Sequence, residues 1–169
     1  MSNFLWSTGQ SNGLITSTQV TLMSTELASV AASSWGVSAV TGSSGVFFPS
    51  TDSGRAIWGE IFYSMGSPGS SVDAMAAGSN LAGWFLVSGD GGVTMESSAA
   101  IPPRAPDFII PFPATTIAPS AAPFKASGLV QLPALPFRVL VSNNSTNTLG
   151  GSSSPGCSLK LAPVAMASS

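Results

Sequence analysis

The sequence predicts an all-β fold: a single-domain β-sandwich of the jelly-roll type with long loops rich in Ser, Gly and Pro. The segments that carry a structural signal are short and rich in β-branched and aromatic residues. Turn residues separate them, with 18 Gly and 13 Pro in 169 residues. No segment longer than about ten residues keeps a helical period. About eight strands with mostly short connections result, which is typical of a sandwich.

We expect the chain to divide into three parts. Residues 1–17 form an extended N-terminal arm, residues 18–165 the β-sandwich domain, and residues 166–169 a flexible tail. One domain is the default for a chain of this length, which is long enough to bury a core.

The first predicted strand is Thr18–Leu27 (TQVTLMSTEL). Met23, Leu27 and Val30 would also lie on one face of a helix, so a helical alternative stays open here. Residues 33–54 are expected to form a long loop, within which Val46–Phe48 could make a short strand.

The strongest strand signals lie in the middle of the chain. Arg55–Met65 (RAIWGEIFYSM) predicts a strand that ends at a Gly-Ser-Pro-Gly turn. Leu81–Ser88 and Val93–Ser97 flank Gly89-Asp90-Gly91-Gly92. Since Asp-Gly suits the positive φ values of a tight turn, these two segments predict a β-hairpin.

The later strands are marked by alternation and by proline. Pro106–Pro113 has proline at both ends, which favours an edge strand or one that crosses between sheets. Three further strands are predicted at Gly128–Leu132, Phe137–Asn143 and Ser158–Val164. Within the second of these, Phe137, Val139 and Val141 point to one face, as on a half-buried sheet.

Two strands are apolar on both faces, those around Trp58 and Trp84. Both tryptophans are expected in the core rather than on a ligand-binding platform. The outer face of these strands needs a cover, which either a loop of the same chain or a neighbouring subunit would supply.

The chain carries very little charge. Only 7% of its residues are charged, against roughly 25% in an ordinary soluble domain. Five Lys and Arg and seven Asp and Glu serve a chain whose mean hydropathy is +0.38. A surface covered with neutral Ser, Thr, Asn and Gly is suited to contact with other protein, which predicts a component of an assembly.

Charge and hydropathy also argue against two kinds of partner. The formal net charge is −2 and the basic residues are scattered singly, so no nucleic-acid partner is expected. Leu27–Ser50 is uncharged, but Ser, Thr and Gly interrupt it too often for a membrane span. The N-terminus has neither the basic nor the continuous apolar region of a secretory signal.

The residues needed for most enzyme chemistry are absent from the sequence. Without His there is no Ser-His-Asp or Cys-His arrangement and no imidazole metal ligand. The single Cys157 makes no internal disulfide or thiolate cluster, and no nucleophile elbow or phosphate-binding loop occurs. Asp90 and Glu96 are read as a turn residue and an exposed strand residue. We therefore expect no catalytic residue, cofactor or metal.

Four phrases, taken in order, resemble those of a known family. TLMSTELASVAASSWG is similar to a leading strand of the "LL-x-TELNSLANG" kind, and RAIWGEIFYSM to an "LYADFELVL" strand. WFLVSGDGGVTMES is similar to "YLLPS-x-DGTNYEDG", and LPALPFRVLVSNNSTNTL to "LPP-x-PFKVLVQNNSG-x-AL". From Thr18 to Val164 the ordered set resembles small virion proteins of tailed bacteriophages, some of which are capsid cement or decoration proteins.

The resemblance implies a β-sandwich that forms a homo-oligomer, a trimer, on the outer capsid surface of the virion, with the major capsid protein as its partner. The family has no catalytic residues to carry over. This chain departs from the family at two places. At strand positions that are polar in the family, this chain has Trp58, Gly59 and Ile61, which would make the outer face more prone to association. At the position of an aromatic residue in the family's hairpin, it has Met95.

The leading functional hypothesis is a non-enzymatic protein that cements a tailed-phage capsid. The alternatives are a glycan- or receptor-binding module of a tail or head fibre and, less favoured without a signal, a secreted adhesin or bacteriocin-like protein. The residues expected to contact the capsid are Phe4, Leu5 and Trp6 on the arm and Trp35, Phe47 and Phe48 on the long loop. The same residues could instead cap the open ends of the sandwich.

Overall fold

A computed structural model describes the chain in thirteen segments, to which all structural statements refer. They are residues 15–16, 20–24, 27, 30–38, 50–51, 54–55, 58–65, 78–90, 94–96, 100–112, 124–146, 149 and 157–165. Their strands are β1 (Ile15–Thr16), β2 (Val20–Met23), β3 (Trp35–Val37), β4 (Ser50–Thr51), β5 (Gly54–Arg55), β6 (Trp58–Met65), β7 (Asn80–Val87), β8 (Phe108–Pro111), β9 (Phe124–Gln131), β10 (Phe137–Asn144) and β11 (Ser158–Ala165).

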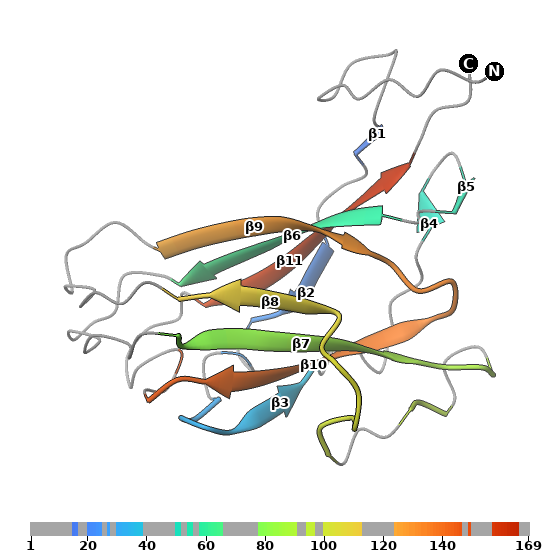
Figure 1. Ribbon diagram of the computed structural model, residues 1–169. Coiled ribbons are helices and arrows are strands. Elements are labelled where there is room, and N and C mark those ends of the chain that lie inside the picture. Colours follow the sequence, from blue (N-terminus) through green and yellow to red (C-terminus); the bar gives the residue numbers. More distant parts are fainter. Residues whose placement is uncertain are drawn as a thin grey trace.

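The strands form two antiparallel sheets that face each other as two layers (Figure 1). The first sheet has the order β1-β11-β6-β9, and β2 pairs with the same edge of β11 as β1. The second sheet has the order β3-β10-β7-β8, while β4 and β5 form a separate short ladder. The predicted all-β sandwich is thereby confirmed at the level of its two sheets.

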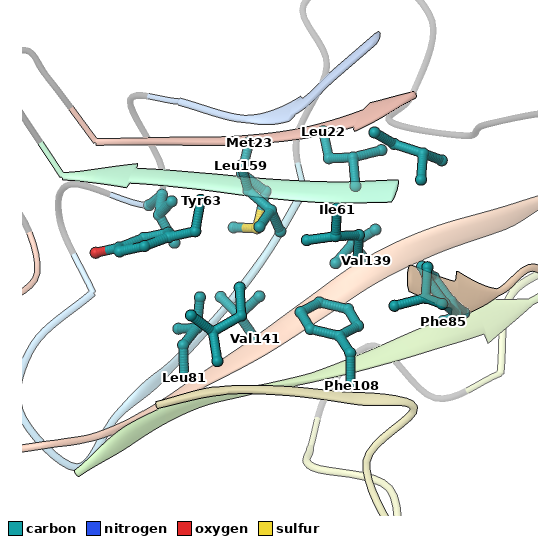
Figure 2. Packing of buried hydrophobic residues seen from close by; sticks show 14 of the residues in the cluster. Leu22, Met23, Ile61, Tyr63, Leu81, Phe85, Phe108, Val139, Val141 and Leu159 are labelled. Atoms are coloured by element: carbon teal, nitrogen blue, oxygen red, sulfur yellow. The ribbon is translucent and has the colours of Figure 1, made fainter. Parts of the chain in front are cut away.

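The core lies between the two sheets and is built by alternation along each strand. Ile61 and Tyr63 of β6 and Leu159 of β11 point from one sheet toward Val139 and Val141 of β10 in the other (Figure 2). Within the second sheet the ring of Phe85 lies 5.6 Å from that of Phe108 and 4.8 Å from that of Phe137. Such apolar interiors supply most of the free energy of folding.

A second, smaller cluster lies on the opposite face of the second sheet. It consists of Ala82, Trp84, Leu86 and Leu140, with Val37 packed against them. At Trp84 the cover comes from the same chain, because the indole Nε1 donates a hydrogen bond of 3.1 Å to the carbonyl oxygen of Arg104. Of the two sources considered for the cover of this face, a loop of the same chain is the one found at Trp84.

Most predicted strands are present, with shifted ends. β6, β7, β10 and β11 match the predicted segments closely, β9 begins at Phe124 rather than Gly128, and β2 covers only part of Thr18–Leu27. β8 pairs with β7 alone, so the predicted edge strand is confirmed. Val46–Phe48, the predicted arm through residue 14 and the tail at residues 166–169 lie outside the described residues. Ile15 and Thr16 pair with Ala165 and Val164.

Two predictions about strand pairing are wrong. Trp35–Val37 falls inside the predicted loop but forms β3, which pairs with β10. A three-residue segment with a glycine at its centre is too short to show the alternation that predicts a strand. It is a strand because it pairs with the edge of β10. The hairpin of Leu81–Ser88 with Val93–Ser97 is also wrong, since β10 and β8 are the strands that pair with β7. Thr94–Glu96 is not strand, although Glu96 N donates to Val87 O at 2.8 Å.

Gly83 is required by the close approach of an aromatic ring. It pairs directly with Phe108 across the β7–β8 ladder, and a Cβ at this position would overlap the Phe108 ring. The ring therefore occupies the space that any other residue at position 83 would fill. Among the described residues no helix is long and apolar enough to cross a membrane.

Gly83→Ala should destabilise the protein by about 1–3 kcal/mol, because the added methyl group forces the Phe108 ring out of the core. Gly128→Ala is the matched control, since a Cβ there meets nothing within 4 Å. The control should change the free energy of unfolding by less than about 0.5 kcal/mol. Denaturant unfolding measures both, and equal stabilities for the two variants would contradict the close packing at Gly83.

Candidate functional site

Trp35 is the one predicted contact residue that lies within the described segments. It is 39% exposed, on the edge strand β3, and faces away from the interior. Its direct cross-strand neighbour is Ser142 of β10. Phe4, Leu5, Trp6, Phe47 and Phe48 lie outside the described residues, so the structure does not test them.

A buried amide holds the turn that leads into Trp35. Asn143 is fully buried, and its side-chain Nδ2 donates to the carbonyl oxygens of Ala31 at 3.1 Å and Val30 at 3.3 Å. Its backbone N–H donates to Ser34 O at 2.8 Å. Buried polar groups of this kind are costly unless they are paired, so the amide ties the turn to β10 and sets the position of β3.

The outer face of the second sheet is closed in the middle and open at both edges. The register places Trp35, Ser142, Ala82 and Ile109 in one row across β3, β10, β7 and β8. Ser142 and Ala82 are buried, whereas Trp35 and Ile109 at the two ends are 39% and 58% exposed. The exposed apolar groups of this face therefore lie at its edges.

The first sheet has the same arrangement at its edges. β2 carries Val20, which is 40% exposed, and β9 carries Leu129, which is 60% exposed. In the described part of the chain, the four end strands whose side chains are described (β2, β3, β8 and β9) thus each present one large exposed apolar side chain. Soluble proteins usually protect such edges with charge or proline. Here the described residues of these strands hold one charge, Lys125, and one proline, Pro111.

The outer face of the first sheet exposes an aromatic ring. Trp58 of β6 is 37% exposed and lies between Val164 of β11 and Gln131 of β9. The prediction that Trp58 is a core residue is therefore wrong, whereas that for Trp84 is confirmed at 5% exposure. The two strands look alike in sequence, but among the described residues a loop covers Trp84, whereas Trp58 is 37% exposed.

Three charged residues that are scattered in sequence meet at one end of β7. Arg104 Nη1 donates to both carboxylate oxygens of Asp107 at 2.9 Å, and its Nε and Nη2 contact Glu96 at 3.3 Å. Arg104 Nη2 also donates to Phe85 O at 2.9 Å, and Phe85 N donates to Asp107 Oδ2 at 2.7 Å. Beyond the end of β8, these side chains therefore replace a strand in satisfying the backbone of β7.

The cluster borders a hollow of about 680 Å³ at this end of the sandwich, which Gln131, Leu132 and Pro133 also line. Hydrogen bonds, to Glu96 first and then to Asp107, raise the pKa of Arg104 above its ordinary value. The guanidinium and both carboxylates are engaged with one another and with the backbone. Their arrangement holds the loop over β7. The sequence spacing of these residues gives no signal of the cluster.

Asp90 caps the turn that follows β7, in agreement with its reading as a turn residue. Its Oδ1 accepts hydrogen bonds from Ser88 Oγ and Thr94 N, both at 2.7 Å. Glu96, expected as an exposed strand residue, is instead an ion-pair partner of Arg104.

The single thiol and the single tyrosine of the chain lie together in the core. Cys157 is buried and its Sγ donates to Leu149 O at 2.9 Å. Burial, and then the neighbouring Cys157, raise the pKa of the Tyr63 phenol well above its ordinary value, so the phenol stays neutral. Within the described segments no group of three or more Cys, Asp or Glu side chains could hold a metal ion.

Comparison with family models, with curated proteins and with solved structures found no match to this chain.

Arg104→Gln should destabilise the protein by about 1–2 kcal/mol, because it removes the charged donor that bridges Asp107, Glu96 and the β7 backbone. We expect no larger loss of stability because the guanidinium is 36% exposed, so water can hydrate the groups that lose their ion-pair partner. Lys125→Gln, at an exposed position, is the control and should leave the free energy of unfolding nearly unchanged. If Arg104→Gln unfolds at the same denaturant concentration as the control, the guanidinium does not support β7.

Proposed function

We propose that the chain is a non-enzymatic virion protein of a tailed bacteriophage, a capsid cement or decoration protein. It binds the outer capsid surface across joints between subunits of the major capsid protein and stabilises the shell against the pressure of packaged DNA. One observation carries the proposal: in a chain with 7% charged residues, the edge strands expose Val20, Trp35, Ile109 and Leu129. The ordered sequence phrases that resemble such virion proteins add to it.

We further propose that the sandwich is a jelly roll, a topology found in viral capsid and lectin domains. The support is the nesting of the strand pairs. Leaving aside the short β1, β4 and β5, the eight strands pair as β7 with β8, β6 with β9, β3 with β10 and β2 with β11. The pairs are nested, from β7 with β8 at the centre to β2 with β11 at the ends of the series. A single long hairpin folded over into two sheets has this order of pairs.

The proposed mechanism is burial of neutral and apolar surface at joints in the shell. The net binding free energy at each site is smaller than the contact energy, because binding loses translational, rotational and side-chain entropy. Several contacts per homo-oligomer, repeated over the shell, would make the attachment effectively irreversible. Because the surface holds few charges, attachment should depend little on salt.

Trp35 is the described residue that we propose as a capsid anchor, together with Phe4, Leu5 and Trp6 of the arm and Phe47 and Phe48. It is 39% exposed on the edge strand β3, and the buried amide of Asn143 ties the turn that precedes it to β10. A tryptophan side chain has only two dihedral angles to order, so it supplies a large contact area at a low cost in conformational entropy.

The test is attachment of the purified protein to phage heads prepared without it. We expect the protein to co-sediment with the heads and to raise the temperature at which they release DNA. Trp35→Ser should lower the number of bound copies. Leu135→Ser, which removes an apolar side chain of similar exposure from a turn, should not. Heads that bind no protein, or imaging that places the chain on the tail, would overturn the cement function.

A second candidate is a glycan-binding module, which Trp58 favours. An exposed indole on the outer face of a sheet, with Gln131 as its cross-strand neighbour and Glu60 two residues along the same face, suits stacking on a sugar ring. Under this alternative the protein binds host polysaccharide saturably, Trp58→Ala abolishes the binding, and Trp35→Ala preserves it. A glycan array without signal would remove this candidate.

A further inference from the structure

We propose that β9 is a self-pairing edge, through which two copies of the chain form an antiparallel, two-fold dimer with one continuous sheet. The observation behind the proposal is the length of the unpaired edge. β9 runs from Phe124 to Gln131 and, among the described strands, pairs with β6 alone. The other strands at sheet ends are shorter: β1 has two residues, β2 four, β3 three and β8 four.

A long free edge presents a row of unpaired N–H and C=O groups, which is a template for pairing with another chain. β9 lacks proline, and Lys125 is its one charged residue. Ser127, Gly128 and Leu129 at its centre are all exposed, the last at 60%. Among the described residues this edge is therefore open, and the one charge that protects it lies near its end.

The faces of β9 limit the registers that two copies could adopt. Ala126 and Val130 pack against the core, whereas Lys125, Ser127, Leu129 and Gln131 face outward. A register that is off by one residue would place outward residues on the core face of the second copy. The two sheets face the same way only when each residue pairs with one that points to the same face in the other copy. The register centred on Gly128 meets this condition and pairs residues 125–131 of one copy with residues 131–125 of the other.

In this register the side chains that lie opposite each other are also chemically compatible. It places Ala126 opposite Val130 of the second copy on the inner face, and Ser127 opposite Leu129 on the outer face. Lys125 lies opposite Gln131 of the second copy, so no like charges meet. Gly128 lies opposite itself at the two-fold axis, where a Cβ would meet nothing within 4 Å.

The neighbouring strand β8 supports a second copy as the occupant. β8 lies beside β9 at the same open side of the sandwich (Figure 1), and a hollow of about 160 Å³ between them is lined by Gly128, Leu129 and Ile109. Because the two sheets of the dimer face the same way, the β8 strands of both copies also come near the axis. Ile109 of β8, 58% exposed, would then lie close to the second copy.

The inference goes beyond the proposed function and does not rest on it. A chain that pairs through β9 dimerises in solution whether or not it binds a capsid, so failure of head binding leaves it standing. It also differs from the trimer that the family resemblance implies.

The first experiment is sedimentation of the full chain over a range of concentrations, with Leu129→Lys as the variant. In the dimer, a lysine at 129 would lie diagonal to Lys125 and to the same lysine of the second copy. The dissociation constant should rise roughly tenfold or more, the change that corresponds to about 1.4 kcal/mol. Trp35→Lys, which changes an exposed apolar residue on the opposite edge, should leave the dimer unchanged. Circular dichroism checks that both variants fold.

The second experiment tests the register by cross-linking. On mild oxidation, a mixture of Ser127→Cys and Leu129→Cys proteins should give a disulfide-linked dimer that joins one copy of each. Either variant alone should give far less. The native Cys157 is buried at 3% exposure and serves as the unreactive background.

Three outcomes would overturn the proposal: a monomer at every concentration, an oligomer that Leu129→Lys does not weaken, or no cross-link in the mixture. A trimer insensitive to Leu129→Lys belongs to the second outcome and would favour the oligomer that the family resemblance implies.

Discussion

The structure depends on the burial of one face of each sheet against the other. Every long strand supplies alternate apolar side chains to this interior, from Tyr63 and Leu159 on one side to Phe85 and Val139 on the other. The fit is close enough that Gly83 has to lack a side chain for the Phe108 ring to lie flat against β7. With so few charges available, apolar packing and backbone pairing do almost all the work of folding.

Three of the twelve charged residues lie together where the backbone pairing of β7 fails. β8 pairs with only half of β7, and the remaining N–H and C=O groups of β7 would face the loop unpaired. Asp107 and Arg104 supply the missing acceptor and donor at Phe85, and Glu96 completes the cluster. The loop that they hold also covers Trp84, so one ionic cluster closes both an edge and an outer face.

The edges that lack such protection are the basis of both proposals on function. Trp35 and Val20 lie on one open side of the sandwich, and Ile109 and Leu129 on the other. A protein that works as a free monomer normally shields such edges, because exposed strands pair and aggregate. Two open sides let one molecule contact a second copy through one and a shell through the other. Cement function and self-pairing are thus physically compatible.

The sequence by itself determined the fold class, the long strands and the scarcity of charge, because alternation, turn residues and composition are local properties. Tertiary structure decided the rest. β3 exists only against β10, β8 rather than a hairpin partner pairs with β7, and Arg104, Glu96 and Asp107 meet only because the loop folds back. Trp58 and Trp84 occur in similar apolar strands, yet one is exposed and the other covered. Such differences depend on which segment, distant in sequence, packs over each face, and local patterns carry no information about that.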